Sequence, residues 1–237
     1  MPRHIGIVAC SAEGAALCYR TIALEGARVL GPHAHPEVSM HTHPLSEYMA
    51  CVRRDDWQGV ARLMLSSARK LAGCGAEFLI CPDNTIHQAL PLVEPESPLP
   101  WLHIARVVAE RAVERGFRRL ALTGTRWLVE SAVYPDALTA RGLEYVRPAP
   151  DEREAINRII FDELVYGQIT PDALACFQRV IGRLREEGCD AVVLGCTEIP
   201  LIVTDANSPL PTLDSTRLLA WAAVASATQR VTEVDGI

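Results

Sequence analysis

The chain has 237 residues, of which 49% are hydrophobic and 22% are charged, so it can bury one large core or two lobes of about 100 residues each. Its formal net charge is -6 and it has no basic run, which argues against binding to nucleic acid or to an anionic membrane surface. No apolar run approaches the roughly 20 residues that a membrane-spanning helix needs, and the N-terminus lacks the layout of a signal peptide. We therefore expect a small-molecule partner and a cytoplasmic location.

The predicted elements alternate along the chain between short apolar runs and long amphipathic stretches. The strand-like runs are residues 4–10, 76–81, 119–123 and 190–195. The helix-like stretches are residues 12–24, 55–74, 101–116, 127–142, 151–166 and 171–187. The proline-rich segment 91–100 and the segment 210–217 are interpreted as crossings between lobes, and an Ala-rich helix follows the second. This alternation predicts an α/β protein with parallel sheets.

Two segments of the chain resemble each other when they are laid together without gaps. They are GAEFLICPDNT, residues 75–85, and GCDAVVLGCTE, residues 188–198. The overlay pairs Asp83 with Cys196 and Asn84 with Thr197. Buried parallel strands deliver side chains at their C-terminal ends, where ligand sites form in open α/β sheets. The repeat fits two lobes that each contribute one strand end to a site.

Polar residues gather where the predicted strands end. The clusters are Ala9-Cys10-Ser11, Asp83-Asn84-Thr85, Thr123-Gly124-Thr125 and Gly195-Cys196-Thr197-Glu198. A helix is expected after each cluster, so backbone N–H groups and hydroxyls would converge on a site suited to a carboxylate. Ordinary helix capping explains any one cluster alone, but it explains four at corresponding strand ends less well. The chain has neither GxGxxG after its first strand nor GxxxxGK[ST], so no nucleotide and no cofactor are expected.

The cysteines and histidines carry weaker signals. The eight cysteines are irregularly spaced and are expected to be reduced. Four of them are expected to be small buried residues: Cys18, Cys51, Cys74 and Cys176. The segment PHAHPEVSMHTHP carries two HxH pairs, formed by His33, His35, His41 and His43. A catalytic zinc needs about three protein ligands, and no further acid stands at a diagnostic spacing, so no metal site is predicted.

Several motifs, in this order along the chain, resemble the aspartate/glutamate racemase family: IGIVACSAEGAALCYR near the start, NTIH at 84–87, LTGT at 122–125, GCTEIP at 195–200 and LDSTR at 213–217. The resemblance spans nearly the full length. It implies two similar α/β lobes related by pseudo-twofold symmetry, with the site in the cleft between them. Here the lobes would be residues 1–97 plus 213–237 and residues 98–212. It also implies an isomerase without a cofactor, usually a homodimer, whose substrate is an amino acid or a related carboxylic acid.

In this family two cysteines, one from each lobe, face opposite sides of the substrate Cα and transfer its proton. Cys196 matches the second cysteine, but the first position holds Asp83. Cys81 lies two residues upstream and is expected to be the last buried residue of its strand. A helix N-terminus after Cys196 would lower the thiol pKa from about 8.5 and make Cys196 a base. Three roles are open for Asp83: a second proton-handling group with a pKa raised by burial, a group that binds a cationic or hydroxyl part of the substrate while Cys196 alone is the catalyst, or a cap on the following helix.

The remaining site candidates follow from the strand ends and from the resemblance. The expected substrate-binding residues are Ser11, Asn84, Thr85, Thr125, Thr197, Glu198, His41 and His43. His87 is expected to hold the strand-end turn without touching the substrate. Three functions stay open: a racemase or epimerase that uses Cys196 and Asp83, an isomerase or decarboxylase that uses one cysteine, and a non-catalytic two-lobed ligand sensor.

Overall fold

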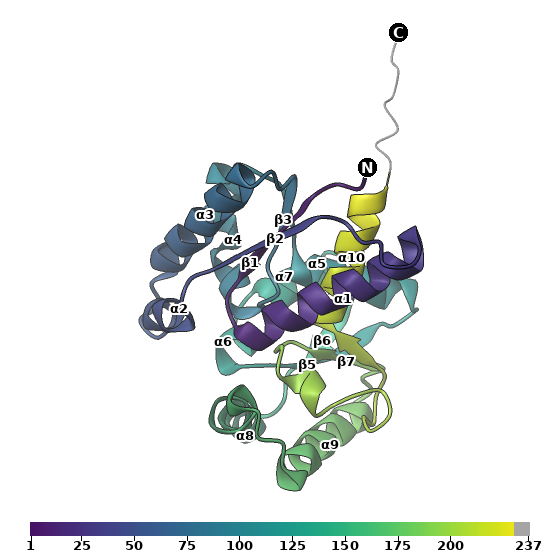
Figure 1. The fold of residues 1–237 in the computed structure, drawn as a ribbon. Helices are drawn as coiled ribbons and strands as arrows, with labels where there is room; N and C mark the ends of the chain where they lie inside the picture. Colours follow the sequence, from purple (N-terminus) through teal and green to yellow (C-terminus); the bar gives the residue numbers. More distant parts are fainter. Residues whose placement is uncertain (230–237) are drawn as a thin grey trace.

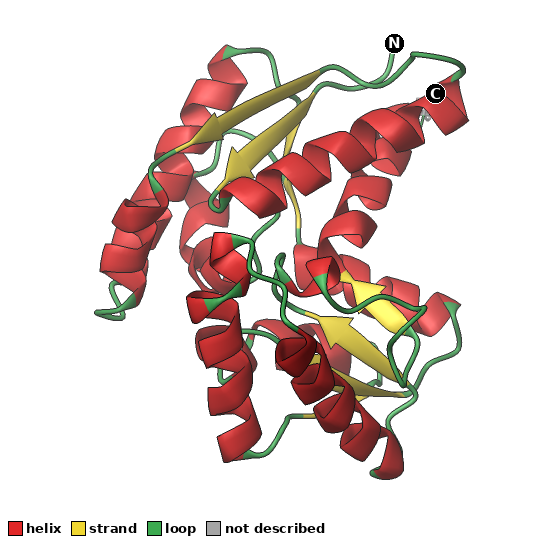
Figure 2. Ribbon diagram, turned by 60° about the horizontal axis from the view of Figure 1, so that its bottom comes forward, coloured by secondary structure: helices red, strands yellow, loops and turns green. Residues whose placement is uncertain are grey.

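A computed structural model describes residues 1–229 of the chain. It contains two lobes, each built on a four-stranded parallel sheet with helices packed on both faces (Figures 1 and 2). The strand orders are β2-β1-β3-β4 and β6-β5-β7-β8, so the two lobes repeat one topology. The predicted α/β class is confirmed. Within the described residues, no helix is long and apolar enough to cross a membrane.

The first sheet and its helices use the N-terminal part of the chain. The elements are β1 (Ile5–Ala9), α1 (Ala12–Leu30), β2 (Val38–Thr42), α2 (Leu45–Val52), α3 (Trp57–Gly73), β3 (Phe78–Ile80), the 3₁₀ helix η1 (Thr85–Ala89), α4 (Leu90–Val93), the 3₁₀ helix η2 (Glu94–Glu96) and β4 (Trp101–Leu102). Two long helices begin at capping side chains: Ser11 accepts from the N–H of Gly14, and Asp56 accepts from the N–H of Gly59. Both caps fix where the chain turns from a loop into a helix.

The second sheet follows with the same order of strands. The elements are α5 (Ile104–Glu114), β5 (Arg119–Thr123), α6 (Arg126–Val129), α7 (Val133–Thr139), β6 (Glu144–Val146), α8 (Pro150–Asp162), η3 (Leu164–Tyr166), α9 (Pro171–Glu186), β7 (Ala191–Leu194), η4 (Ile199–Leu201), β8 (Thr212–Asp214) and α10 (Ser215–Thr228). Helix α10 returns to the first lobe, where it packs beside α1 and α5 (Figure 1).

The four predicted strands are the two central strands of each sheet, and the four strands that the sequence pattern missed are the edge strands. The central strands β1, β3 and β7 are buried at every position, which produces the continuous apolar runs. The edge strands β2 and β6 mix half-buried and exposed positions, so they lack such a run. The histidine-rich segment 32–44 contains one of these edge strands, β2.

Several predicted helices also differ from the observed ones. The stretch 101–116 begins with β4, because Trp101 and Leu102 pair with Leu79 and Ile80 of β3. The stretch 127–142 is interrupted between α6 and α7, and the stretch 151–166 ends in a 3₁₀ turn. The proline-rich segment expected to connect the lobes contains most of α4 and all of η2 before the chain reaches β4.

The predicted division of the chain into lobes differs slightly from the membership of the sheets. Strand β4 belongs to the first sheet although it follows residue 97, and β8 belongs to the second sheet although it extends to Asp214. If the lobes are defined by their sheets, the chain therefore passes from one lobe to the other a few residues later than expected at both places. Residues 230–237 of the predicted first lobe lie outside the described residues. The division of the chain into these two domains stays a prediction.

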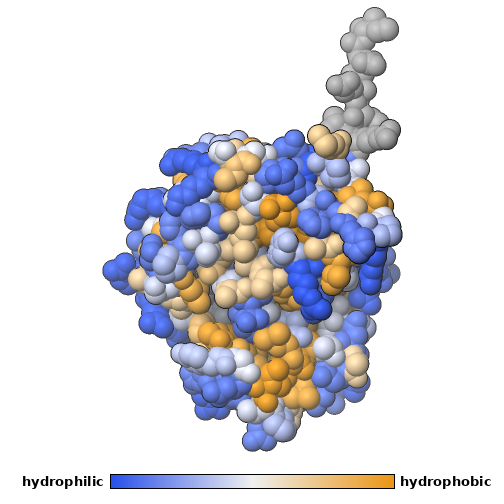
Figure 3. All heavy atoms as spheres, viewed as in Figure 1, coloured by the Kyte–Doolittle hydropathy of each residue, from blue (hydrophilic) through white to orange (hydrophobic). Residues whose placement is uncertain are grey.

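Each sheet is buried between two layers of apolar side chains. In the first lobe, one face packs against α1 and α10 through residues that include Ile22 and Val224, and the other face packs against α3 through residues that include Met64. In the second lobe, α8 and α9 cover one face, while α5 and α7 cover the other. Figure 3 shows a surface with a mostly hydrophilic rim and hydrophobic residues gathered near the centre of the lower lobe.

Candidate active site

A cavity of about 450 Å³ lies between the lobes at the C-terminal ends of the central strands. Its polar lining residues are Cys10, Ser11, Tyr48, Arg53, Asp83, Asn84, Thr85, Thr125, Asn157, Asp162, Tyr166, Cys196, Thr197 and Glu198. Its outer wall is largely apolar and includes Leu45, Met49, Val52, Trp127, Ile160, Phe161 and Val165. This volume and this mixture of linings are typical of a small-molecule site. Eight predicted site residues therefore line one cavity: Ser11, Asp83, Asn84, Thr85, Thr125, Cys196, Thr197 and Glu198. The first and the last of them are 187 positions apart in the sequence.

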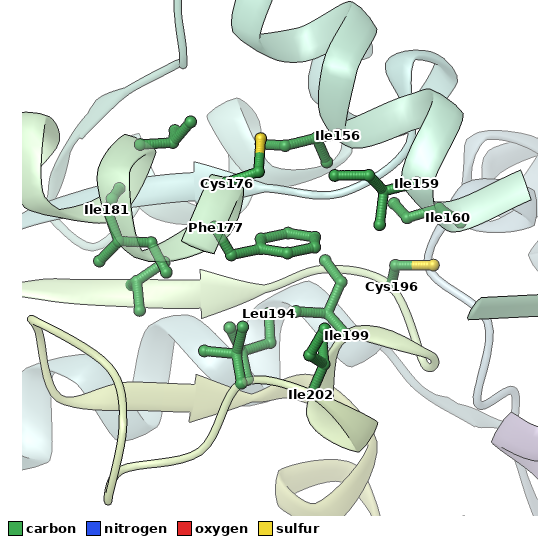
Figure 4. Packing of buried hydrophobic residues seen from close by; sticks show 14 of the residues in the cluster. Ile156, Ile159, Ile160, Cys176, Phe177, Ile181, Leu194, Cys196, Ile199 and Ile202 are labelled. Carbon is green, nitrogen blue, oxygen red and sulfur yellow. The ribbon is translucent and has the colours of Figure 1, made fainter. Parts of the chain in front are cut away.

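Cys196 follows β7 and enters the cavity from the second lobe. Figure 4 shows it at the edge of the apolar cluster of α8 and α9, with its sulfur pointing away from the ring of Phe177. Its backbone carbonyl accepts the N–H of Ile199 at 3.2 Å, which closes the tight turn into η4. The rigid cluster and this turn hold the thiol at the end of the strand.

A chain of hydrogen bonds connects Cys196 to the first lobe. The thiol donates to Oε2 of Glu198 at 2.9 Å, and the hydroxyl of Thr197 donates to the same oxygen at 2.8 Å. Because Thr197 has one hydroxyl proton, the hydroxyl of Ser11, 3.3 Å away, is the donor in the bond between Ser11 and Thr197. Ser11 in turn accepts the N–H of Gly14 at 3.2 Å. Glu198 thus acts on the thiol directly.

Asp83 and its neighbours form the corresponding strand end in the first lobe. Oδ1 of Asp83 accepts the N–H of Ile86 at 3.1 Å, so the carboxylate does cap the turn into η1. The backbone carbonyl of Asp83 lies 2.6 Å from Nδ1 of His87, and Nε2 of His87 accepts the N–H of Ile104 at 3.3 Å. This pattern places the proton of neutral His87 on Nδ1. His87 therefore holds the turn that carries Asp83 without lining the cavity.

Other polar side chains join the lobes beside the cavity. The hydroxyls of Thr85 and Thr125 lie 3.1 Å apart across the cleft. Asn84 donates from Nδ2 to Ser215 at 2.9 Å and accepts from the hydroxyl of Tyr134 at 2.7 Å. The side-chain amide of Asn84 is therefore occupied by partners in the protein, a role that the strand-end pattern did not predict.

Gly14 allows a close approach of the two lobes at the rim of the site. A Cβ at this position would lie 2.7 Å from the backbone oxygen of Pro82 and 2.7 Å from Cγ2 of Thr197. Both distances are shorter than a carbon can tolerate, and the Pro82 oxygen belongs to the backbone beside Asp83. The absence of a side chain at Gly14 thus lets α1 sit against both strand ends.

Burial raises the pKa values of three groups in the cavity, Cys10, Asp83 and Cys196. Burial, followed by the Glu198 carboxylate, raises the pKa of the Cys196 thiol well above its ordinary value. Burial raises the pKa of Asp83 above its usual range, and the charge of Glu198 adds to that increase, although the N–H of Ile86 opposes it. We expected a helix N-terminus to lower the pKa of Cys196, and this expectation is wrong. Only the short η4 follows, and burial beside a carboxylate dominates.

His41 and His43 do not reach the cavity. They lie at the end of β2, where Nδ1 of His41 is 2.9 Å from the Ser67 hydroxyl and Nε2 of His43 is 3.1 Å from the Ser66 hydroxyl. Nε2 of His41 also accepts from Lys70 at 2.9 Å. An edge strand of the first sheet carries both rings onto α3, so the structure gives them no contact with a substrate in this cavity. Across residues 1–229, no cluster of three or more His, Cys, Asp or Glu side chains could hold a metal ion.

The cysteines separate into three groups. All eight are free, and Cys18, Cys81 and Cys176 are buried as expected. Cys51 is half-buried and Cys74 is exposed, because Cys74 caps the end of α3 where the helix meets solvent. Cys10 was not among the predicted site residues, yet it lines the cavity with Cys196 and Asp83. Its place directly after a central strand was the signal that could have identified it.

The chain thus has two similar parallel α/β lobes, with thiol and carboxylate groups meeting in a cavity at their strand ends. The model of one family, Asp/Glu/Hydantoin racemase, matches residues 6–223. The chain belongs to this family of isomerases.

Solved structures and curated relatives agree with this assignment. A candidate Asp/Glu racemase from Yersinia pestis is 32% identical, with a TM-score of 0.89 over 96% of this chain and 100% of that one. An aspartate racemase homologue from Pyrococcus horikoshii is 29% identical, with a TM-score of 0.83 over 97% and 100% of the two chains. The broad specificity amino-acid racemase RacX of Bacillus subtilis is 23% identical over 81% of this chain and 82% of that protein. A glutamate racemase from Pseudomonas aeruginosa is 31% identical, but the match spans only 55% of this chain and 48% of that enzyme.

Proposed function

We propose that the protein is a cofactor-independent racemase or epimerase of an amino acid or a related carboxylic acid. Cys196 from the second lobe and Asp83 from the first lobe supply the two proton-handling sides of the site. The observation that carries this proposal is that both residues line one buried cavity from different lobes. Inversion at Cα needs removal of a proton on one face and delivery on the other, and a site built from two lobes provides both faces.

The polar residues around the two groups suit the charge that develops during the reaction. Loss of the Cα proton sends negative charge onto the substrate carboxylate, which then resembles an enediolate. The hydroxyls of Thr85 and Thr125 line the cavity and bond to each other, so one of the two keeps a proton that it can donate to those oxygens. Glu198 accepts the Cys196 proton when the thiol acts as a base, since the two groups are already hydrogen-bonded. These residues therefore orient the substrate and stabilise its carbanion.

The cavity favours a substrate with an uncharged, apolar side chain. Three carboxylates line it, of which Glu198 is buried, Asp83 is half-buried and Asp162 is exposed, and the outer wall is mostly apolar. A second substrate carboxylate would meet like charge in a poorly solvated space, whereas an α-ammonium group would be attracted. Arg53 is the one lysine or arginine among the residues that line this cavity, and it is exposed. An amino monocarboxylate fits this balance better than aspartate or glutamate does.

The test is Cα hydrogen exchange in deuterated water, followed by mass spectrometry and by chiral analysis of the recovered acid. A panel contains both antipodes of methionine, leucine, phenylalanine, glutamate and aspartate. We expect exchange with loss of optical purity for the apolar amino acids and at least about tenfold slower exchange for the two dicarboxylates. Release of carbon dioxide would instead indicate the decarboxylase alternative, and tight binding without exchange would indicate a ligand sensor.

The predicted homodimer and the cytoplasmic location also belong to this proposal. Sedimentation velocity at micromolar concentration tests the dimer, since a monomer at all concentrations would contradict it.

A further inference from the structure

Cys10 stands beside Asp83 because of the register of the first sheet. Strand β1 pairs with β3 in parallel, and Ile7 is opposite Ile80. Cys10 and Asp83 each come three residues after that pair, so both leave the sheet at the same level. Cys10 is 5% exposed and lines the cavity, as does Cys196, which is 8% exposed. The cavity therefore receives one thiol from each lobe.

The surroundings of the two thiols correspond. Cys196 donates to the carboxylate of Glu198 in the second lobe. Burial raises the pKa of the Cys10 thiol, and the nearby Asp83 carboxylate is the next cause, with smaller contributions from Cys81 and Glu198. The Cys10 thiol and the Asp83 carboxylate therefore influence each other's pKa, as groups at the same level of neighbouring strands do. Each lobe thus presents a buried thiol and a carboxylate to the cavity, hydrogen-bonded to each other in the second lobe and at the same level of the sheet in the first.

We propose that Cys10 is the group that faces the substrate Cα in the first lobe, and that Asp83 acts through Cys10 by accepting its proton. This inference rests on the proposed function and identifies which atom carries the proton on the first-lobe side. It makes the site a pair of thiols, Cys10 and Cys196, each supported by a carboxylate.

The chemistry favours sulfur as the atom that contacts Cα. A Cα proton is only weakly acidic, and a thiolate is a stronger base than a carboxylate by about 4.5 pK units in their reference states. Asp83 is also already engaged, since its Oδ1 accepts the N–H of Ile86. A carboxylate fixed in this way is suited to receive the proton of a neighbouring thiol.

One turnover balances as follows. Asp83 takes the proton of the Cys10 thiol, and the resulting thiolate removes the Cα proton to become a thiol again. The electron pair of the broken C–H bond moves into the substrate carboxylate as an enediolate. Cys196 then delivers its proton to the opposite face of Cα and becomes a thiolate. Asp83 ends with one proton more and Cys196 with one fewer, and exchange with water restores the resting state.

The first test compares Cys10→Ala with Cys18→Ala. Both thiols are buried in the first lobe, but Cys18 lies outside the cavity, on the buried face of α1. The readout is Cα deuterium exchange of each antipode of the acid that the wild-type protein racemises fastest. We expect Cys10→Ala to lose racemisation by about 10³-fold or more and to lose exchange of one antipode. Exchange of the other antipode persists, since Cys196 can still remove a proton and return a deuteron on its own face.

Matched outcomes separate this inference from the proposed function. The Cys196→Ala variant should exchange only the antipode that Cys10→Ala no longer exchanges. The Cys18→Ala variant should exchange both antipodes at the wild-type rate. If the Cys10→Ala variant exchanges both antipodes at the wild-type rate, the inference is wrong but the proposed function still stands. A wild-type protein that exchanges no acid of the panel overturns both. If Cys10→Ala does not fold, Cys10→Ser takes its place with the same expected loss.

The second test asks whether Asp83 touches Cα or acts through sulfur. Asp83→Asn keeps an oxygen for the N–H of Ile86 but cannot accept the thiol proton. If Cys10 is the base, exchange on the first-lobe face is slow at pH 7 and recovers as the pH rises, because hydroxide can deprotonate the thiol directly. Removal of the Asp83 charge also lowers the pKa of Cys10 and assists that recovery. Exchange on this face that does not rise with pH between 7 and 10, in a folded variant, assigns the proton transfer to Asp83 itself and overturns the inference.

Discussion

The strand ends of the two lobes occupy corresponding places but are built differently. In the second lobe, Cys196 and the carboxylate that binds it, Glu198, both follow β7 and are separated by one residue. In the first lobe, the carboxylate Asp83 follows β3, and the nearest cavity thiol, Cys10, follows β1. Repetition of the sheet topology therefore preserved the position of the site, while the chemical groups at that position diverged.

The supports of the two strand ends also differ. The first-lobe turn is fixed by His87, which bonds the backbone of Asp83 and of Ile104. The second-lobe turn is fixed by side chains that are themselves in the cavity, namely Thr197 and Glu198. A substitution of His87 therefore changes the stability of the turn without removing a side chain from the cavity. A substitution of Thr197 or Glu198 changes both the turn and the chemistry of the cavity.

The largest expected effect is loss of turnover in Cys196→Ala. Removal of the thiol eliminates the proton carrier of one face, so racemisation should fall by about 10³-fold or more while ligand binding persists. Cys176→Ala is a matched control, because Cys176 is also 8% exposed and belongs to the same apolar cluster. Polarimetry on both variants measures the difference. Equal activity in the two variants would remove Cys196 from the mechanism.

The next effect concerns the carboxylate of the second lobe. Glu198→Gln keeps the size of the side chain but removes the charge that raises the pKa of Cys196. We expect racemisation to fall by about 10²-fold, since the thiol loses its proton acceptor, and iodoacetamide to alkylate Cys196 faster at pH 8, since its pKa falls. Glu187→Gln, on the surface, is the control. Slower alkylation in Glu198→Gln would contradict the assigned role of the charge.

His87→Leu tests the support of the first lobe through stability. It leaves the carbonyl of Asp83 and the N–H of Ile104 without their partner, at a cost of about 2 kcal/mol in the free energy of unfolding at pH 7. Burial, the first cause, lowers the pKa of His87 to about 4. Its contribution is therefore present above the unfolded pKa of about 6.5 and is lost as the pH falls through about 4. Urea titrations should show the difference from wild type shrinking over that interval, and a constant difference would refute this account.

The smallest effect tests the contact between the lobes. Gly14→Ala forces a methyl group against Pro82 and Thr197 and should destabilise the protein by about 1–2 kcal/mol. Gly182→Ala, in α9 with open space around it, should be neutral or stabilise the protein by up to about 1 kcal/mol. Thermal unfolding of both variants gives the comparison. A Gly14→Ala protein as stable as Gly182→Ala would show that the lobes do not need this close approach.

The sequence by itself determined the fold class, the four central strands and the residues that gather at their ends. These features depend on local patterns: a strand buried on both faces must be apolar throughout, and its end must supply polar groups. The motif order also identified the family, and the overlay of residues 75–85 on 188–198 matched Asp83 to Cys196 on strands that hold the same place in their sheets.

Only the tertiary structure decided which polar groups act on one another. The edge strand β2 carries His41 and His43 away from the cavity, because pairing with β1 directs the end of that strand onto α3. The sheet register brings Cys10 level with Asp83 across 73 positions of sequence, from residue 10 to residue 83. The pKa of Cys196 depends on burial and on Glu198, and a local motif cannot report either, since desolvation is a property of everything packed around the thiol.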